Sequence, residues 1–369
     1  MLDKNEKSPL TLLVHAKITA FDWGKVVVDL FKAQAIKKKL PLSVVYHPQD
    51  VKDFHAPIIV FGVDSEWLQN VFDYFAPHKT QILLLCGATG KTYENVSYIT
   101  IDQQMLVKKC IRLLSDCNRT KPAFFGAQKN DTSDAIKAYT FSTFFPQSDV
   151  YSVDDSVEVT CNRLLENVEN YDSVICANDV MAIYLLMRCR EKKIEIPEKL
   201  FLIGNGNLWL SAHVTPSLTT LVSDAEATVE LALQMRKSIC KFPACAPLNV
   251  YISGDVLPRE STAHFNKTES FQDQKRNSRP QHTAVYPPHS LYPCLAQICN
   301  LDEALSCLSE EKKTMLRLIR QGSSYAEIAE KVFLSEDTIH YHLKKLYKRL
   351  GVNTKKAFCA LLDSYGIQL

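Results

Sequence analysis

Short apolar runs alternate with longer amphipathic stretches along most of the chain. The apolar runs carry hydrophobic residues at consecutive positions, as strands of a parallel sheet do when helices cover both faces. They lie at residues 11–15, 42–46, 57–61, 81–85, 123–125, 173–176 and 201–204. The stretches with helical spacing of apolar positions lie at residues 23–39, 103–114, 133–144, 157–168, 180–192 and 226–242. This alternation predicts a doubly wound α/β architecture, and its length favours two lobes.

The composition changes at about residue 260. Residues 260–281 are rich in Lys, Arg, Asn, Gln, Ser and Thr, and the prolines Pro287, Pro288 and Pro293 follow, where a helix is disfavoured. We therefore expect a two-lobed domain over residues 9–263, a linker over 264–300 and a C-terminal domain over 301–369.

The C-terminal domain has a purely helical pattern with a capping residue before each helix. Ser309, Ser324 and Ser335 each precede an apolar stretch, and each can accept a hydrogen bond from a free amide of the first turn. Gly322 and Gly351 follow the first and third stretches, as glycine does at helix C-termini. A fourth helix is expected over residues 354–365. Two short helices, a tight turn and a following helix with a polar face are typical of a helix-turn-helix.

The third helix of this domain has two contrasting faces. One face is apolar, and we expect it to be buried, with its histidine packed rather than in contact with DNA. It consists of Ile339, His342, Leu346 and Leu350. The opposite face is polar and basic, and consists of Thr338, His340, Tyr341, Lys344, Lys345 and Lys348. Residues 309–369 carry eleven Lys and Arg against seven Asp and Glu, in a chain whose net charge is +2. This basic face indicates a nucleic-acid partner, the alternative being a solvated helix surface.

The C-terminal domain resembles the LuxR-type, or GerE, helix-turn-helix. The resemblance covers residues 308–365 and rests on Gln321-Gly322, Ala326-Glu327-Ile328-Ala329, Leu334-Ser335-Glu336-Asp337-Thr338-Ile339 and Leu350-Gly351-Val352. Lys312 departs from the glutamate that this family usually has there. The resemblance implies that the third helix enters the major groove of double-stranded DNA. His340, Tyr341 and Lys344 would then face base edges, and Thr338, Lys345 and Lys348 would hold phosphates.

Polar residues follow one of the apolar runs of the α/β region. The run at residues 173–176 leads through Ala177 to Asn178 and Asp179, where a helical stretch begins. Proteins of this class bind ligands at the carboxyl ends of their strands. Asp179 is equally suited to cap the following helix, so the sequence leaves both roles open.

The α/β region resembles the effector-binding domain of the LacI/GalR family. The resemblance covers about residues 11–263 and is strongest over Asn178-Asp179-Val180-Met181-Ala182, Ile203-Gly204-Asn205, Pro216-Ser217-Leu218-Thr219-Thr220 and Pro258-Arg259-Glu260-Ser261-Thr262. It implies two lobes, as in periplasmic binding proteins, that close around a sugar, sugar phosphate or nucleoside-like effector. By this resemblance Trp23, Lys137 and Asn178 contact the effector. To these we add the polar residues Asp179, Asn205 and Asn207 as candidates.

Two positions depart from the family's pattern. Gly206 stands where the family has an aspartate, which removes a carboxylate that recognises sugar hydroxyls. Lys137 stands where the family has an arginine, and lysine cannot make the same two-pronged contact. Either the effector is atypical, or the region has lost its effector and serves to dimerise the chain.

The sequence gives little support to an enzyme. Residues 87–92 follow an apolar run and are similar to a phosphate-binding loop, but Leu85 occupies the place of that motif's first glycine. The histidines lack metal-ligand spacing, and many of the twelve cysteines lie in apolar runs, so we expect reduced cysteines, no metal and no cofactor. Neither a signal peptide nor a membrane-spanning stretch is recognisable, which favours a cytoplasmic protein.

Together these features predict a ligand-responsive transcription factor that binds double-stranded DNA as a homodimer. A small molecule bound between two lobes would modulate the pair of DNA-binding domains. Two alternatives stay open. One is an effectorless scaffold in which the α/β region only dimerises the DNA-binding domains, and the other is an enzyme of sugars or nucleosides that carries a DNA tether.

Overall fold

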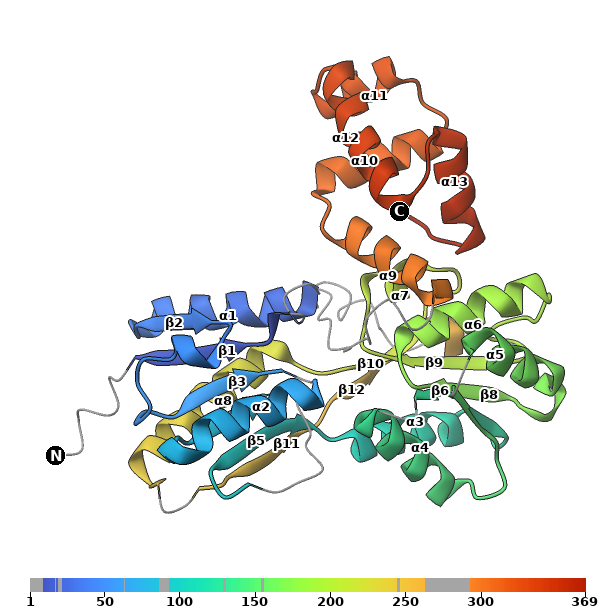
Figure 1. The fold of residues 1–369 in the computed structure, drawn as a ribbon. Coiled ribbons are helices and arrows are strands. Elements are labelled where there is room, and N and C mark those ends of the chain that lie inside the picture. The colour runs from blue at the N-terminus through green and yellow to red at the C-terminus, as the bar shows by residue number, and fades with distance from the viewer. Residues whose placement is uncertain are drawn as a thin grey trace. The chain divides into compact units, whose positions relative to one another are not determined.

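The computed structural model describes residues 9–16, 18, 22–62, 64–85, 93–128, 131–153, 156–243, 246–262 and 293–369. The chain forms two compact units. The first holds residues up to 106 together with 222–255, and the second holds 107–221 together with 256–369. Each unit is thus assembled from segments that are far apart in the sequence (Figure 1).

The first unit is built on a six-stranded sheet with the strand order β11-β5-β4-β3-β1-β2. All neighbouring strands in it run parallel. The strands are β1 (Leu10–Val14), β2 (Leu42–Val45), β3 (Ile58–Phe61), β4 (Ile82–Leu85), β5 (Val96–Ile101) and β11 (Asn249–Ile252). The helices are α1 (Asp22–Lys38), α2 (Ser65–Phe75) and α8 (Ala225–Lys241). Every residue of β1, β3 and β4 is buried, as expected for strands that are covered on both faces.

The α/β part of the second unit repeats this design. Its sheet has the order β12-β10-β9-β8-β6-β7, and the strands from β10 to β7 run parallel. The strands are β6 (Pro122–Gln128), β7 (Val150–Val153), β8 (Ser173–Cys176), β9 (Phe201–Asn205), β10 (Thr219–Val222) and β12 (Asp255–Leu257). The helices are α3 (Gln103–Asp116), α4 (Thr132–Phe144), α5 (Val157–Glu166), α6 (Asp179–Glu191) and the short α7 (Trp209–His213). Strands β8 and β9 lie at the centre of the sheet.

The predicted α/β class with two lobes is confirmed by these sheets. The predicted strands correspond to β1–β4, β6, β8 and β9, and the predicted helices to α1, α3–α6 and α8, with shifts of a few residues at their ends. The hydrophobic pattern did not reveal β5, β7, β10, β11 and β12, nor helices α2 and α7.

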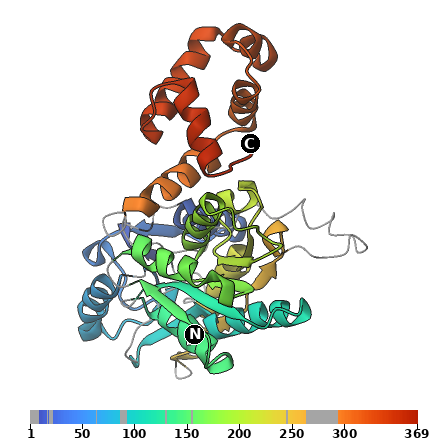
Figure 2. The ribbon, with the colours of Figure 1, turned by 90° about the vertical axis from the view of Figure 1, so that its right-hand side faces the viewer.

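Five helices form the C-terminal part of the second unit (Figure 2). They are α9 (Pro293–Ser306), α10 (Glu310–Arg320), α11 (Tyr325–Val332), α12 (Glu336–Leu350) and α13 (Lys355–Ser364). The predicted caps are confirmed, because Ser309, Ser324 and Ser335 each accept a hydrogen bond from a first-turn amide. Ser324 and Glu327 form a reciprocal capping box at the start of α11. Gly351 ends α12 at φ 70°, in the left-handed region that favours glycine.

The C-terminal end of the predicted linker is helical. Residues 264–292 lie outside the described residues, but α9 begins at Pro293, so residues 293–300 are helical. Proline is disfavoured inside a helix because it has no backbone N–H to donate. At the first helical position this costs nothing, because an N–H there has no acceptor within the helix. Pro293 therefore begins a helix here.

One hydrophobic core runs through the α/β part and the C-terminal helices of the second unit. Helix α9 packs against α6 and α7 on one side and against α12 on the other. Its residues Ile298, Leu301 and Leu305 are fully buried. The C-terminal helices are therefore joined to the α/β part by an apolar interface.

None of the helices in the described residues combines the length and apolar composition needed to cross a membrane. The cysteines whose side chains are described form no disulfide with one another, and Cys110, Cys161, Cys176 and Cys189 are buried.

We expect Ser335→Ala to destabilise α12, because the Ser335 hydroxyl accepts the amide hydrogen of Thr338. Loss of such a cap costs about 1 kcal/mol, which would accelerate amide exchange in the first turns of α12 by about fivefold. Hydrogen–deuterium exchange of the full chain measures this. Ser335→Asp keeps an acceptor at the same place and should exchange like the wild type. Equal exchange in all three proteins would contradict the role of this cap.

Candidate functional site

Helix α12 buries an apolar stripe against its neighbours. The buried residues are Ile339, Leu343, Leu346, Tyr347 and Leu350. The Tyr347 ring lies 5.2 Å from the Phe358 ring of α13. The stripe is rotated slightly from the predicted one, because Leu343 and Tyr347 belong to it. His342 is only partly buried at its edge, and burial together with the charge of Lys312 lowers the pKa of this imidazole.

The opposite face of α12 carries the predicted DNA-binding residues. His340, Tyr341, Lys344, Lys345 and Lys348 are exposed, and Tyr341 is 62% exposed. Thr338 is partly buried, and its hydroxyl lies 2.8 Å from that of Ser335. Within the described residues, no carboxylate forms a salt bridge with any of these three lysines. The structure thus brings all six residues to one helix, with a basic surface that is not neutralised locally.

Two aromatic residues beside this face were not predicted. The ring of Tyr325, the first residue of α11, lies 4.2 Å from the ring of His340. Phe333 forms the turn between α11 and α12 at φ 56°, and its side chain is 93% exposed. Phe333 therefore stands exposed on the turn that leads into α12. Its place directly before Leu334-Ser335 was the only local signal for it.

Asn178 caps helix α6, so capping, one of the two roles left open for Asp179, belongs to its neighbour. The Asn178 Oδ1 accepts the Met181 amide at 2.9 Å. Among the described residues, none accepts a hydrogen bond from the Nδ2 of Asn178, and the side chain is 8% exposed. The carboxamide therefore keeps one polar atom for a ligand at the carboxyl end of β8.

Lys137 lies beside this strand end. Its ammonium donates to the Ala177 carbonyl at 2.6 Å and forms a salt bridge of 2.7 Å with Asp134 one turn earlier on α4. The side chain is only 6% exposed. The structure therefore brings Lys137 and Asn178 together at β8, but it neutralises the lysine within the protein.

Asp179 is fully buried, and its carboxylate is surrounded by donors from the protein. The Thr220 hydroxyl donates to Oδ1 at 2.6 Å. The Ser211 hydroxyl and the Leu208 amide donate to Oδ2 at 2.6 and 2.9 Å. Burial raises the pKa of Asp179, while these hydrogen bonds act in the opposite direction. The side chain thus joins α6 to β10 and α7, and protein donors engage both of its carboxylate oxygens.

The two asparagines near the end of β9 differ in accessibility. Asn205 is the last residue of β9 and is partly exposed. Asn207 is 3% exposed at φ 49°, and its Oδ1 accepts a hydrogen bond from Arg259 at 2.6 Å. Asn205 therefore remains a candidate contact, whereas Asn207 is held by Arg259. Between them Gly206 has φ 128°, a backbone conformation that disfavours the family's aspartate.

Trp23 belongs to the first unit. It lies in the first turn of α1, and its side chain falls outside the described residues.

Comparison with sequence-family models separates the same two parts of the chain. A model of periplasmic binding protein-like domains matches residues 118–262. A model of the bacterial regulatory proteins of the luxR family matches residues 306–360. The first match contains Asn178 and Lys137, and the second contains the whole of α12.

The similar curated proteins match parts of this chain. The HTH-type transcriptional repressor PurR of Vibrio atlanticus (strain LGP32) is 37% identical over 67 residues, which is 18% of this chain and 20% of that protein. The uncharacterized HTH-type transcriptional regulator YvdE of Bacillus subtilis (strain 168) is 20% identical over 219 residues, 58% of this chain and 60% of that protein. The chain thus spans 20% and 60% of the lengths of these relatives.

Among solved structures, the transcriptional regulator CelR in its cellobiose complex matches with a TM-score of 0.57. The match covers 70% of this chain and 85% of that one at 13% sequence identity, and at that identity it shows the fold alone. The chain therefore joins a periplasmic binding protein-like domain, with a fold like that of the CelR regulator, to a C-terminal domain that matches the luxR family of bacterial regulatory proteins.

Proposed function

We propose that this protein is a transcription regulator that reads double-stranded DNA through α12 and responds to a small molecule bound by its periplasmic binding protein-like domain. The observation that carries the proposal is the exposed basic face of α12. That face stands on a capped helix with a buried apolar stripe, behind a tight turn from α11. A solvated surface helix requires no such turn, so DNA reading accounts for more of these features.

The six residues of this face divide into two groups by their chemistry. His340, Tyr341 and Lys344 carry groups that can hydrogen-bond to base edges in the major groove. Thr338, Lys345 and Lys348 suit phosphate oxygens, which position the helix without reading sequence. Thr338 is partly buried and lies near the N-terminus of α12, where phosphates commonly bind, so we assign it to the phosphate-binding residues.

The effector proposed for the α/β region is a sugar, a sugar phosphate or a nucleoside-like molecule. The CelR structure is described as a complex with cellobiose. Asn178, Lys137, Asn205 and Trp23 remain the proposed contacts. Asp179 and Asn207, which the family resemblance does not assign to the effector, are left out because protein groups already engage their side chains.

One observation favours the scaffold alternative. The lysine in place of the family's arginine is buried and paired with Asp134, and Gly206 supplies no carboxylate. A region without an effector would then only hold two DNA-binding domains together. We place this alternative second, because none of the described residues accepts a hydrogen bond from the Nδ2 of Asn178 at the strand end.

We propose further that the protein acts as a homodimer. Two copies of α12 would then read two-fold half-sites that lie one or a few helical turns of DNA apart. The proposed domain limits are residues 9–263 for the sensor and residues 293–369 for the DNA-binding domain, the latter enlarged from the expected start at 301 to include α9.

We expect Lys344→Ala to weaken binding to the operator by ~1–3 kcal/mol, because a base contact would be lost. Fluorescence anisotropy with an operator selected from random duplexes measures this. Lys192→Ala, an equal loss of charge at an exposed site after α6, is the matched control and should bind normally. Unchanged binding of the Lys344→Ala protein would remove this residue from the base-reading group.

A thermal-shift screen of the full chain tests the sensor. The panel contains sugars, sugar phosphates, nucleosides and purines. A ligand present at 100 times its dissociation constant adds about 2.7 kcal/mol of stability, which raises the melting temperature measurably. A reproducible shift identifies the chemical class of effector. No shift across the panel would contradict the sensor and favour the scaffold.

For an effector found in this way, we expect the Asn178→Asp protein to need at least ten times more ligand than the wild type for the same rise in melting temperature. Aspartate caps a helix as well as asparagine does, so α6 keeps its acceptor for the Met181 amide, but the Nδ2 donor is lost. Binding to DNA without effector should be unchanged. A normal ligand response in this variant would place the effector elsewhere.

A further inference from the structure

Helix α7 lies where the α/β part of the second unit meets the DNA-binding domain. It has only five residues, Trp209–His213, and no side chain of its own segment caps its start. A helix this short has few internal hydrogen bonds and depends on its surroundings. Its surroundings come from both domains.

The α/β part holds α7 through one carboxylate. The Asp179 Oδ2 accepts hydrogen bonds from the Leu208 amide and the Ser211 hydroxyl, and Oδ1 accepts one from Thr220 of β10. The start of α7, the start of α6 and strand β10 therefore share a single buried charge. Asn178, the proposed effector contact, is the residue directly before Asp179.

The DNA-binding domain holds both ends of the same helix. At its start, the buried Asp302 of α9 accepts the Leu210 amide at 2.8 Å. At its end, the His213 carbonyl accepts the Gln368 amide at 2.6 Å. The cap that α7 lacks in its own sequence is thus supplied by α9.

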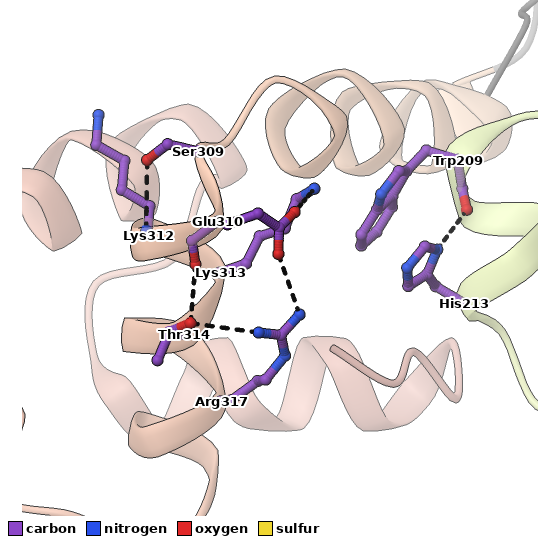
Figure 3. A network of polar contacts seen from close by, with 8 residues as sticks. All are labelled: Trp209, His213, Ser309, Glu310, Lys312, Lys313, Thr314 and Arg317. Atoms are coloured by element: carbon purple, nitrogen blue, oxygen red, sulfur yellow. Dashed lines mark hydrogen bonds and ion pairs between the residues drawn. The ribbon is translucent and has the colours of Figure 1, made fainter. Parts of the chain in front are cut away.

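Side chains from α10 complete the contact (Figure 3). Trp209 is buried and stacks on His213 with ring centroids 3.6 Å apart, and the Lys313 ammonium lies 5.8 Å above the Trp209 ring. Glu310 accepts a hydrogen bond from Lys313 at 2.8 Å and lies 3.6 Å from Arg317. A basic helix thus faces a stacked aromatic pair from α7.

We propose that α7 is the element through which the sensor and the DNA-binding domain influence each other, with Ser211 and Asp302 as its positioning residues. This proposal rests on the proposed function, and it adds the physical connection between the effector site and the DNA-binding domain. A displacement near Asn178 that moves Asp179 moves the start of α7, and α9 follows because Asp302 is bonded to that start. By thermodynamic reciprocity, loosening either end of this route loosens the other.

Hydrogen–deuterium exchange of the full chain tests this route without effector or DNA. We expect Ser211→Ala to accelerate exchange in α7 and also in α9, by about fivefold, the factor for one lost buried hydrogen bond. We expect Asp302→Ala to accelerate exchange in α9, α7 and β10. Asp302→Asn keeps an acceptor oxygen for the Leu210 amide and should restore protection.

Matched controls separate transmission from general loosening. Thr160→Val removes a buried hydroxyl hydrogen bond from α5 in the same unit and should leave α7 and α9 unchanged. Glu303→Ala removes a neighbouring carboxylate of α9 that pairs with Arg349 at 2.8 Å, and it should leave α7 unchanged. The fully buried strand β1 of the first unit serves as the internal reference.

Faster exchange that stays within one of the two helices α7 and α9 would overturn the proposal. If Ser211→Ala loosens α7 while α9 stays protected, or if Asp302→Ala leaves α7 protected, the two domains are not coupled through this helix. A failed effector screen would contradict the proposed sensor and leave the exchange result standing. A positive screen with confined exchange would contradict only the route through α7.

Discussion

The buried carboxylate of Asp179 sets the arrangement of the second unit. An ionised carboxylate is costly to bury unless hydrogen-bond donors surround it. Here the donors come from Thr220, Ser211 and the Leu208 amide, so β10 and the start of α7 must stay close to the start of α6. Strand β9 must also make room, because a Cβ at Gly204 would lie 2.1 Å from the Asp179 Oδ1. One side chain therefore constrains four segments that are distant in the sequence.

The DNA-binding domain is built on a different balance of forces. Its helices begin at serine or threonine caps and close on an apolar stripe, so its local structure follows from neighbouring residues. Its attachment to the α/β part depends on contacts distant in sequence, namely the buried face of α9 and hydrogen bonds such as that from the Leu210 amide to the buried Asp302. Because apolar burial is non-directional, the polar contacts to α7 decide the register of this attachment.

Sequence reasoning succeeded where the determining contacts are local. The pairs Ser324 with Glu327 and Ser335 with Thr338 lie within one turn, and the polar face of α12 follows from helical spacing. It did not find α7, because the acceptor for the Leu210 amide is Asp302, 92 positions later. The sequence left the role of Asp179 open because Asn and Asp are equally good helix caps, and only the packing against β10 and α7 separates Asn178 from Asp179. Strand β7 was missed because it is short and only alternately buried.

Helix α9 also defines what can be moved between proteins. The luxR-type family model matches from residue 306, at the end of α9. A fusion protein designed from this sequence similarity would therefore transfer the DNA-binding domain without α9. Such a chimera would expose the host's equivalent of α6 and α7, and it would separate Asp302 from the helix that it caps. The segment that must be transferred is therefore longer than the segment that the family model recognises. It starts at Pro293, and it requires a recipient with a short helix at the place of α7.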